Sequence, residues 1–134
     1  MKRNLVLSFI FTMMLITSCS DESGSVRLGN IERVKFHQSI KYSDAYIRVK
    51  LDSVLNDSRC PVDAECFWEG NAEVRFEITI ENEVKRVVLN TTLQPKNAQI
   101  NDYNIELVSL MPLPKSGSII KQSDYYAEIK LQKI

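Results

Sequence analysis

Residues 72–81 read AEVRFEITIE, and this stretch decides the fold class. Apolar side chains occupy every second position, and charged or hydroxyl side chains stand between them. This alternation is typical of an antiparallel strand with one buried face and one face in water. Asn82 follows, which tolerates the positive φ of a tight turn, and a second apolar run covers residues 84–89. The sequence therefore predicts a β-hairpin at the centre of the chain.

The register of that hairpin stays open at this stage. Val84 and Val88 favour one face of the second strand, whereas Val87 and Leu89 favour the other. Because side chains alternate across a strand, a slip of one residue would exchange the two faces.

Further strands are predicted on both sides of the hairpin, over residues 34–42, 47–51, 103–110 and 125–131. The apolar phase changes between Leu107 and Val108, as at a β-bulge or in a strand buried on both faces. Residues 95–102 and 112–118 are the longer predicted loops. About six strands and no convincing helix predict a single antiparallel β-sandwich, immunoglobulin-like, over residues 33–134. A small β-barrel is the alternative, since periodicity does not distinguish stacked sheets from closed ones.

The N-terminus has the pattern of a cleaved signal. Lys2 and Arg3 precede an apolar run over residues 5–16, which is shorter than the roughly 20 residues of a membrane span. Residues 16–19, ITSC, end the run, and the whole segment resembles a bacterial lipoprotein signal peptide with its lipobox. The resemblance implies that residues 1–18 are removed and that the Cys19 thiol carries a diacylglycerol. A secretory signal without lipid is the alternative.

This resemblance also predicts a location. Ser20 is a residue that lipoproteins sorted to the outer membrane commonly carry, so we expect an anchor in the outer membrane, at its periplasmic face or at the cell surface. Residues 19–32 are expected to form a flexible tether between the lipid and the domain, because a polar stretch with Ser23, Gly24 and Ser25 buries little apolar surface.

The length and net charge of the chain limit which classes of partner it can bind. The whole chain has 17 basic and 17 acidic residues, and removal of Lys2 and Arg3 leaves a mature chain with a net charge of about −2. No basic footprint for nucleic acid remains. The remaining residues suffice for one domain. The expected partners are the membrane, through the lipid, and a protein or glycan of the envelope.

The cysteines agree with an oxidising compartment. Once Cys19 carries lipid, Cys60 and Cys66 remain as an even pair, which we expect to form a disulfide. The closed loop is about seven residues long, so the chain-entropy estimate of its stabilisation is about 2 kcal/mol. The bond is expected to shape a loop more than to hold the domain together.

That loop lies within residues 57–72, DSRCPVDAECFWEGNA. The pattern D-S-R-C-P, a second cysteine after four residues, then W-x-G-x-A resembles a family of small bacterial, often lipid-anchored β-domain proteins without an assigned activity. The resemblance covers about 16 residues closely. It implies a fold and a compartment, and it implies no catalytic residues.

Two interpretations of the loop differ in where the aromatic residues lie. In the structural one, Trp68 covers the disulfide or one end of the core, Phe67 is exposed, and Arg59 pairs with Asp57 or satisfies loop carbonyls. In the functional one, Phe67 and Trp68 project as a binding tip, with Arg59 and Glu69 beside them. We expect the core position for Trp68.

Metal and catalytic patterns are weak. His37 is the only histidine and is expected on the wet face of a strand, so Cys60 and Cys66 lack partners for a tetrahedral zinc site. The acidic residues of the loop lack the spacing and central glycine of an EF-hand; they are Asp57, Asp63, Glu65 and Glu69.

No nucleophile elbow, phosphate-binding loop or Cys-His dyad occurs in the sequence. We therefore expect a non-enzymatic envelope lipoprotein without a cofactor or metal, acting as a binding or accessory module. The alternatives are a small inhibitor lipoprotein that acts on a hydrolase and an enzyme that uses carboxylates.

Overall fold

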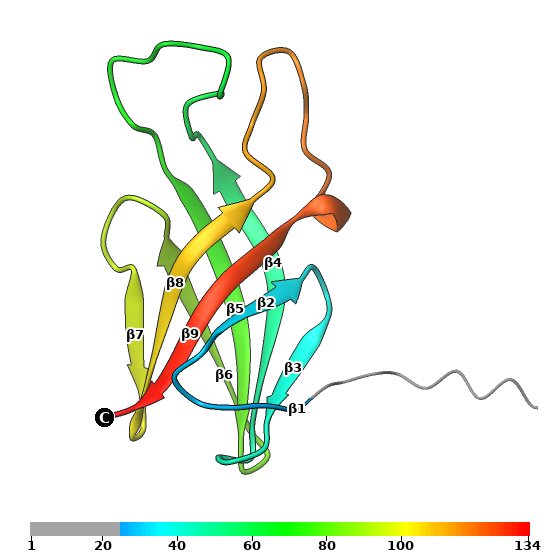
Figure 1. Ribbon diagram of the computed structural model, residues 1–134, viewed down its shortest axis with the longest axis vertical. Coiled ribbons are helices and arrows are strands. Elements are labelled where there is room, and N and C mark those ends of the chain that lie inside the picture. The colour runs from blue at the N-terminus through cyan, green and yellow to red at the C-terminus, as the bar shows by residue number, and fades with distance from the viewer. Residues whose placement is uncertain (1–24) are drawn as a thin grey trace, which may run out of the picture.

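The structure is a computed structural model that describes residues 25–134. The predicted signal peptide, Cys19 and the first part of the predicted tether lie outside these residues. Strands of the described part form two sheets that face each other, one of five strands and one of four (Figure 1). The two sheets do not join into a closed barrel, so the predicted β-sandwich is confirmed.

The first sheet has the order β1-β3-β4-β5-β6. Its strands are β1 (Ser25–Val26), β3 (Ser39–Tyr42), β4 (Ile47–Asp57), β5 (Ala72–Ile80) and β6 (Glu83–Asn90). The second sheet has the order β2-β9-β8-β7. Its strands are β2 (Ile31–Lys35), β9 (Tyr126–Lys133), β8 (Tyr103–Met111) and β7 (Asn97–Ile100), and the 3-10 helix η1 (Gln122–Asp124) precedes β9.

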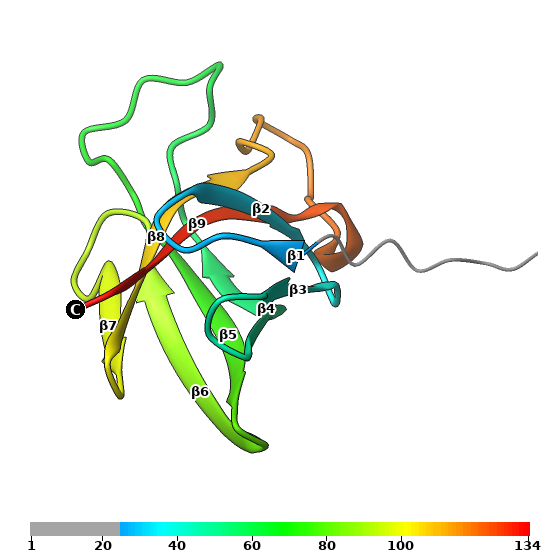
Figure 2. The same ribbon diagram turned by 60° about the horizontal axis from the view of Figure 1, so that its bottom comes forward.

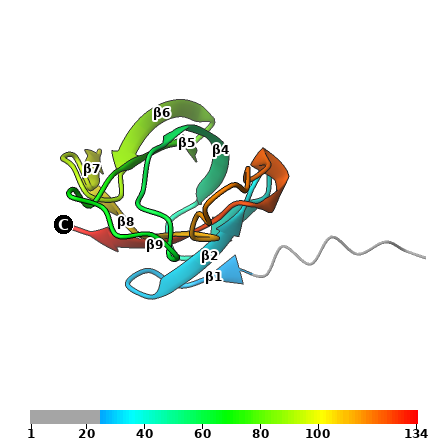
Figure 3. The same ribbon diagram turned by 90° about the horizontal axis from the view of Figure 1, so that it is seen from above.

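After β1 and β2, which belong to different sheets, the chain completes the first sheet before it builds the rest of the second. Strands β3 to β6 form a meander, strands β7 to β9 form a second one, and β2 adds to the outer side of β9 (Figure 2). All neighbouring strands are antiparallel except β1 and β3. Viewed along the strands, the two layers enclose the core (Figure 3).

The predicted central hairpin is confirmed, and its register is now fixed. Glu81 and Asn82 both have positive φ, at 47° and 72°, as a two-residue turn of type I′ requires. Val74 lies opposite Leu89. Leu89 is therefore buried in the core, whereas Val84 is 51% exposed.

The phase change in β8 is a β-bulge. The pairing with β9 shifts between Leu107 and Ser109, so Leu107 and Leu110 both face the core although they are three positions apart, an odd step that would place them on opposite faces of a regular strand. Fully burying a large apolar side chain contributes about 1.5–3 kcal/mol. The most completely buried large side chains come from both sheets; they are Tyr42, Phe76, Ile47, Leu51, Ile78, Leu89, Ile105, Leu110, Ile129, Leu131, Val34 and Val49.

Three boundaries differ from the sequence expectations. The strand predicted over residues 34–42 is two strands in different sheets, because the backbone turns at His37, which has φ 58° and is exposed. The loop predicted over residues 95–102 contains β7, which pairs with β8. Part of the predicted tether is ordered, since β1 pairs with β3 and β2 pairs with β9. These short strands are held through main-chain pairing, which needs no long apolar alternation.

The two ends of the sandwich carry different features. Val26 lies opposite Tyr42, which in turn lies opposite Ile47, so β1 is beside the end that holds the β5–β6 turn. The loop that follows Asp57 rises from the other end (Figure 1). Within residues 25–134, no helix has the length and hydrophobicity needed to cross a bilayer.

Leu89→Ala tests the register of the hairpin. Leu89 has no exposed surface, so its truncation is expected to lower the free energy of unfolding by about 2–5 kcal/mol. Val84→Ala, on the outer face of the same strand, should change it by no more than about 0.5 kcal/mol. Urea unfolding of both variants measures the difference, and equal effects would contradict this register.

Candidate functional site

The connection between β4 and β5 projects beyond both sheets (Figure 1). Its two arms continue the pairing of the strands, because the Ser58 N–H donates to the Asn71 carbonyl at 2.7 Å and the Cys60 N–H donates to the Glu69 carbonyl at 3.3 Å. Only residues 61–68 extend past this ladder. We call residues 61–68 the tip.

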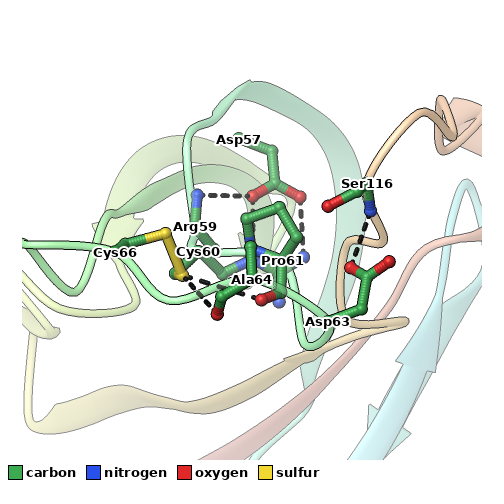
Figure 4. Close-up of a disulfide and its surroundings, with 8 residues drawn as sticks. All are labelled: Asp57, Arg59, Cys60, Pro61, Asp63, Ala64, Cys66 and Ser116. Atoms are coloured by element: carbon green, nitrogen blue, oxygen red, sulfur yellow. Dashed lines mark hydrogen bonds and ion pairs between the residues drawn. A yellow bond between two sulfur atoms is a disulfide. The ribbon is translucent and has the colours of Figure 1, made fainter.

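The tip is closed by the predicted disulfide, which is confirmed. Cys60 and Cys66 are bonded, with their Cα atoms 6.0 Å apart, a normal separation for a disulfide (Figure 4). The bond joins the last residue of one arm to a residue six positions on. The tip is therefore a small ring attached to a two-stranded stem.

Arg59 fixes the base of this stem. Its Nε and Nη2 donate to the two carboxylate oxygens of Asp57 at 2.8 and 2.6 Å, a bidentate pair (Figure 4). The same guanidinium donates to the carbonyl of Leu110 and, at 2.9 Å, to that of Pro112. The predicted pairing of Arg59 with Asp57 is thus confirmed. The carbonyl groups that Arg59 satisfies belong to Leu110 and Pro112 rather than to its own loop, so the group ties the loop to the end of β8.

The pair is nearly dry, since the Arg59 and Asp57 side chains are 9% and 11% exposed. Burial alone would raise the pKa of Asp57, but hydrogen bonds from Arg59 and Tyr125 and the charge of Arg59 outweigh it and hold that pKa below its usual value. The Tyr125 hydroxyl donates to Asp57 Oδ2 at 2.9 Å. Burial and the Asp57 carboxylate raise the pKa of Tyr125 to about 12, so the hydroxyl keeps its proton.

Gly70 allows the two arms to approach each other. Its φ is +76°, and a Cβ at this position would lie 2.2 Å from the Ser58 carbonyl oxygen. A side chain is therefore excluded by backbone atoms as well as by the dihedral angle. The glycine of the W-x-G-x-A pattern is explained by this contact.

A buried asparagine pair attaches the stem to the loop after β6. Asn71 Nδ2 donates to Asn90 Oδ1 at 2.7 Å, and both residues are buried. Asn71 Oδ1 accepts the backbone N–H groups of Thr92 and Leu93 at 3.1 and 3.2 Å. Sequence patterns gave no signal for this pair, because its members are 19 positions apart and only the pairing of β5 with β6 brings them together.

The tip itself is held by the loop of residues 112–118. The Val62 N–H donates to the Pro114 carbonyl at 3.0 Å, and the Ser116 N–H donates to Asp63 Oδ1 at 2.8 Å (Figure 4). The hydrogen bond from the Ser116 backbone lowers the pKa of Asp63, so this carboxylate stays ionised. The two loops therefore form one joined surface.

The expectation that Trp68 packs on the core is wrong. Trp68 is 70% exposed, and Phe67 is fully exposed, as expected. The stem ladder ends at Glu69, so Trp68 lies one step beyond the last paired residue and past the ends of the sheets. Of the predicted binding residues, Glu69 is also exposed, whereas Arg59 holds the base of the loop. We call the Phe67 and Trp68 side chains the aromatic tip.

The surroundings of the aromatic tip are convex. Val62 and Leu113, one on each of the joined loops, add exposed apolar surface. A groove at the base of the stem, lined by Arg59, Glu69 and Thr92, holds about 260 Å³, less than the roughly 300–1,000 Å³ of small-molecule sites. This end of the molecule therefore resembles a ridge that enters a partner more than a cleft that receives a ligand.

The acidic side chains of the described part of the chain bear on metal binding and on acid-base chemistry. Among residues 25–134, no three His, Cys, Asp or Glu side chains gather where they could hold a metal ion. The carboxyl pKa values that the fold shifts all move downward, and they belong to Asp52, Asp57, Asp63 and Glu128. For Asp52 and Glu128 the leading cause is a side-chain hydrogen bond, from Arg75 and Ser109 respectively.

Comparison of the chain with protein families, with curated proteins and with solved structures found no match.

Arg59→Met tests the buried pair. It leaves Asp57 buried without its cation, so we expect the free energy of unfolding to fall by about 3–5 kcal/mol at pH 7. Arg86→Met is the control, because Arg86 pairs with Glu77 at the surface and such pairs contribute about 0–1 kcal/mol.

The lowered pKa of Asp57 predicts that the effect of Arg59→Met on the free energy of unfolding depends on pH. The folded-state pKa of Asp57 is lowered, so its contribution is present at neutral pH and is lost as the pH falls below about 4 toward that lowered pKa. The cost of Arg59→Met should therefore shrink on acidification, as a protonated Asp57 needs no cation. Denaturant unfolding at pH 7 and at about pH 3, inside this window, measures the change. A cost no larger than that of Arg86→Met would contradict the assignment.

Proposed function

We propose that this protein is a lipid-anchored binding module of the cell envelope that recognises a protein partner through the aromatic tip. One observation carries the proposal: Phe67 and Trp68, adjacent in sequence, both lie in water on a loop that the rest of the domain holds in place. Burying a large aromatic side chain contributes about 1.5–3 kcal/mol. The folded domain gains little of this free energy from Phe67 and Trp68, because both are exposed. Tryptophan is also among the residues most enriched in the energetic centres of protein interfaces.

The order of the loop supports a binding role. The disulfide, the stem ladder and the hydrogen bonds to residues 112–118 hold the tip in the absence of any partner. A segment that is ordered in advance loses less conformational entropy on association, so more of the contact energy appears as affinity.

The chemistry around the aromatic tip suits a protein partner. Val62 and Leu113 add exposed apolar surface on the two joined loops, and the exposed carboxylates of Glu65 and Glu69 are near the aromatic tip in sequence. An apolar centre with a polar margin is the usual arrangement of protein interfaces. The partner surface is therefore expected to offer an apolar recess with basic groups at its margin.

Inhibition of a hydrolase is a second candidate function. It is favoured by the convex shape, since two joined loops project together beyond the sheets as an insert for a cleft (Figure 1). An enzyme that uses carboxylates has less support. The shifted carboxyl groups of the described residues all favour the ionised form, whereas a general acid needs a raised pKa.

Trp68→Ala and Phe67→Ala are expected to abolish partner binding without unfolding the domain. Both side chains are exposed, so the free energy of unfolding should change by no more than about 0.5 kcal/mol. Truncation of an interface centre should weaken binding by about 2 kcal/mol or more, a loss of roughly thirtyfold. Thermal melts and affinity capture from envelope extract, with the full chain as bait, measure the two effects.

Val84→Ala is the matched control, an exposed valine on the outer face of β6. A partner captured equally by wild type, Val84→Ala and Trp68→Ala would contradict recognition by the aromatic tip. A captured hydrolase whose activity falls with wild type and not with Trp68→Ala would identify the inhibitor function.

The proposed anchor rests on the sequence of residues 1–19. Because the lipid is attached through the Cys19 sulfur, Cys19→Ser should abolish incorporation of labelled palmitate and release the protein from membranes or stall its processing. Metabolic labelling with a detergent-partition assay measures this. A Cys19→Ser product that still takes up label and partitions into detergent would contradict the anchor.

A further inference from the structure

A pocket lies at the end of the first sheet opposite the aromatic tip. It holds about 600 Å³, within the roughly 300–1,000 Å³ of small-molecule sites. Side chains from β1, β3, β4 and β5 and from two turns line it, among them Ser25, Lys41, Tyr46, Arg48, Thr79 and Glu81.

Two cations face each other at this pocket. Lys41 of β3 lies directly opposite Arg48 of β4, and Arg48 lies directly opposite Thr79 of β5. These residues alternate with buried ones, so they share the outer face of the sheet. Like charges in directly opposed positions destabilise a sheet, so a lysine facing an arginine is costly unless something else holds both.

Other cations of the same sheet form ion pairs. Arg75 pairs with Asp52 at 2.6 Å, and Arg86 pairs with Glu77 at 3.0 Å. Within residues 25–134, neither Lys41 nor Arg48 has an ion pair. The pocket therefore presents two positive groups whose donors are available to an anionic ligand.

Tyr46 adds a ring at the margin of the pocket. It is 89% exposed and has φ 51°, a left-handed conformation that is unfavourable for a residue with a bulky side chain. Strained residues of this kind concentrate at ligand-binding sites, where the surrounding structure holds them in place. An exposed tyrosine ring offers a flat apolar face, which suits the C–H face of a sugar.

The remaining groups select among anions. Glu81 also lines the pocket, and its negative charge opposes a dianion such as phosphate more than a ligand with a single negative charge. A carboxylate also accepts hydrogen bonds from hydroxyl groups. Thr79 and Ser25 supply hydroxyls that both donate and accept. Two cations, one carboxylate, hydroxyls and an aromatic face together match a ligand that has one anionic group and several hydroxyl groups.

We propose that this pocket binds an anionic sugar of the uronic acid class, with its carboxylate on Lys41 and Arg48 and its ring against Tyr46. Glu81 and Thr79 receive the sugar hydroxyls. The site is separate from the aromatic tip, so it does not depend on the function proposed there.

Calorimetric titration of the full chain in non-ionic detergent tests the proposal, with glucuronate as the probe and glucose at the same ionic strength as the neutral comparison. Glucuronate should give a saturable one-to-one signal, and glucose should bind at least about tenfold more weakly. Arg48→Gln and Lys41→Gln should each weaken glucuronate binding by about tenfold or more. Lys50→Gln is the matched control, since Lys50 is on the same strand outside the pocket and should leave the affinity unchanged.

Tyr46→Asn separates ligand binding from folding. Asparagine tolerates positive φ, so the melting temperature should be equal to or above that of wild type, while glucuronate binding falls by about fivefold or more. A melting temperature that rises with unchanged glucuronate affinity would overturn the role of the ring.

Three outcomes would overturn the proposal as a whole. The first is no saturable signal by about 10 mM glucuronate. The second is equal binding of glucose and glucuronate, or equal effects of Arg48→Gln and Lys50→Gln. The third is Arg48-dependent binding to phosphatidylglycerol vesicles without binding to glucuronate, which would assign the two cations to a lipid headgroup instead.

Discussion

The ion pair between Arg59 and Asp57 is the interaction on which the arrangement of the loops depends. One guanidinium joins the end of β4 to the carbonyl groups at the end of β8, and Tyr125 adds a third segment just before β9. A pair this dry stabilises a structure only when its hydrogen bonds are nearly all made, and here they are. Without it, the stem would keep its ladder and the hydrogen bond from Tyr125, but it would lose its two contacts with the carbonyl groups at the end of β8.

The residues near the sheets and the residues at the tip of the loop have different roles, and the ion pair accounts for this difference. The residues closest to the sheets make close polar or backbone contacts. Arg59 and Asn71 bind backbone groups of distant segments, Asp57 binds the Arg59 and Tyr125 side chains, and Gly70 lies against the backbone of Ser58 in the opposite arm. The residues furthest away, Phe67 and Trp68, leave all or most of their apolar surface in water. Polar contacts therefore hold the base of the loop, and the apolar side chains at its tip are free to contact another molecule.

The sequence predicts the strands well where one face is buried over many residues, as in β5 and β9, because alternation then extends over four or more positions. It does not predict β1 and β7, which are held through main-chain pairing. The partnership of Asp57 and Arg59 was predictable because the residues are two positions apart. Tyr125 was not, since it lies 68 positions from Asp57 and only the stacking of the sheets brings it there.

The prediction of a core position for Trp68 was wrong for a similar reason. Strand parity says which face a side chain takes, but it does not say where the partner sheet ends, and Trp68 lies beyond that end. No sequence pattern predicts that Lys41 and Arg48 lie opposite each other, because this position depends on the register of β3 against β4.

The entry of the chain at β1, on the end away from the tip, has a consequence for reach. Strand β4 runs between the two ends over 11 residues, which corresponds to about 36 Å at the usual rise per residue. With the proposed lipid on Cys19, at most about 20 Å of extended chain separates the bilayer from Ser25. On such an anchor, the aromatic residues can stand some tens of ångströms from the lipid surface, because they lie at the end of the domain opposite the entry of the chain. A soluble protein, or one with a tall extramembrane domain, is therefore within their reach.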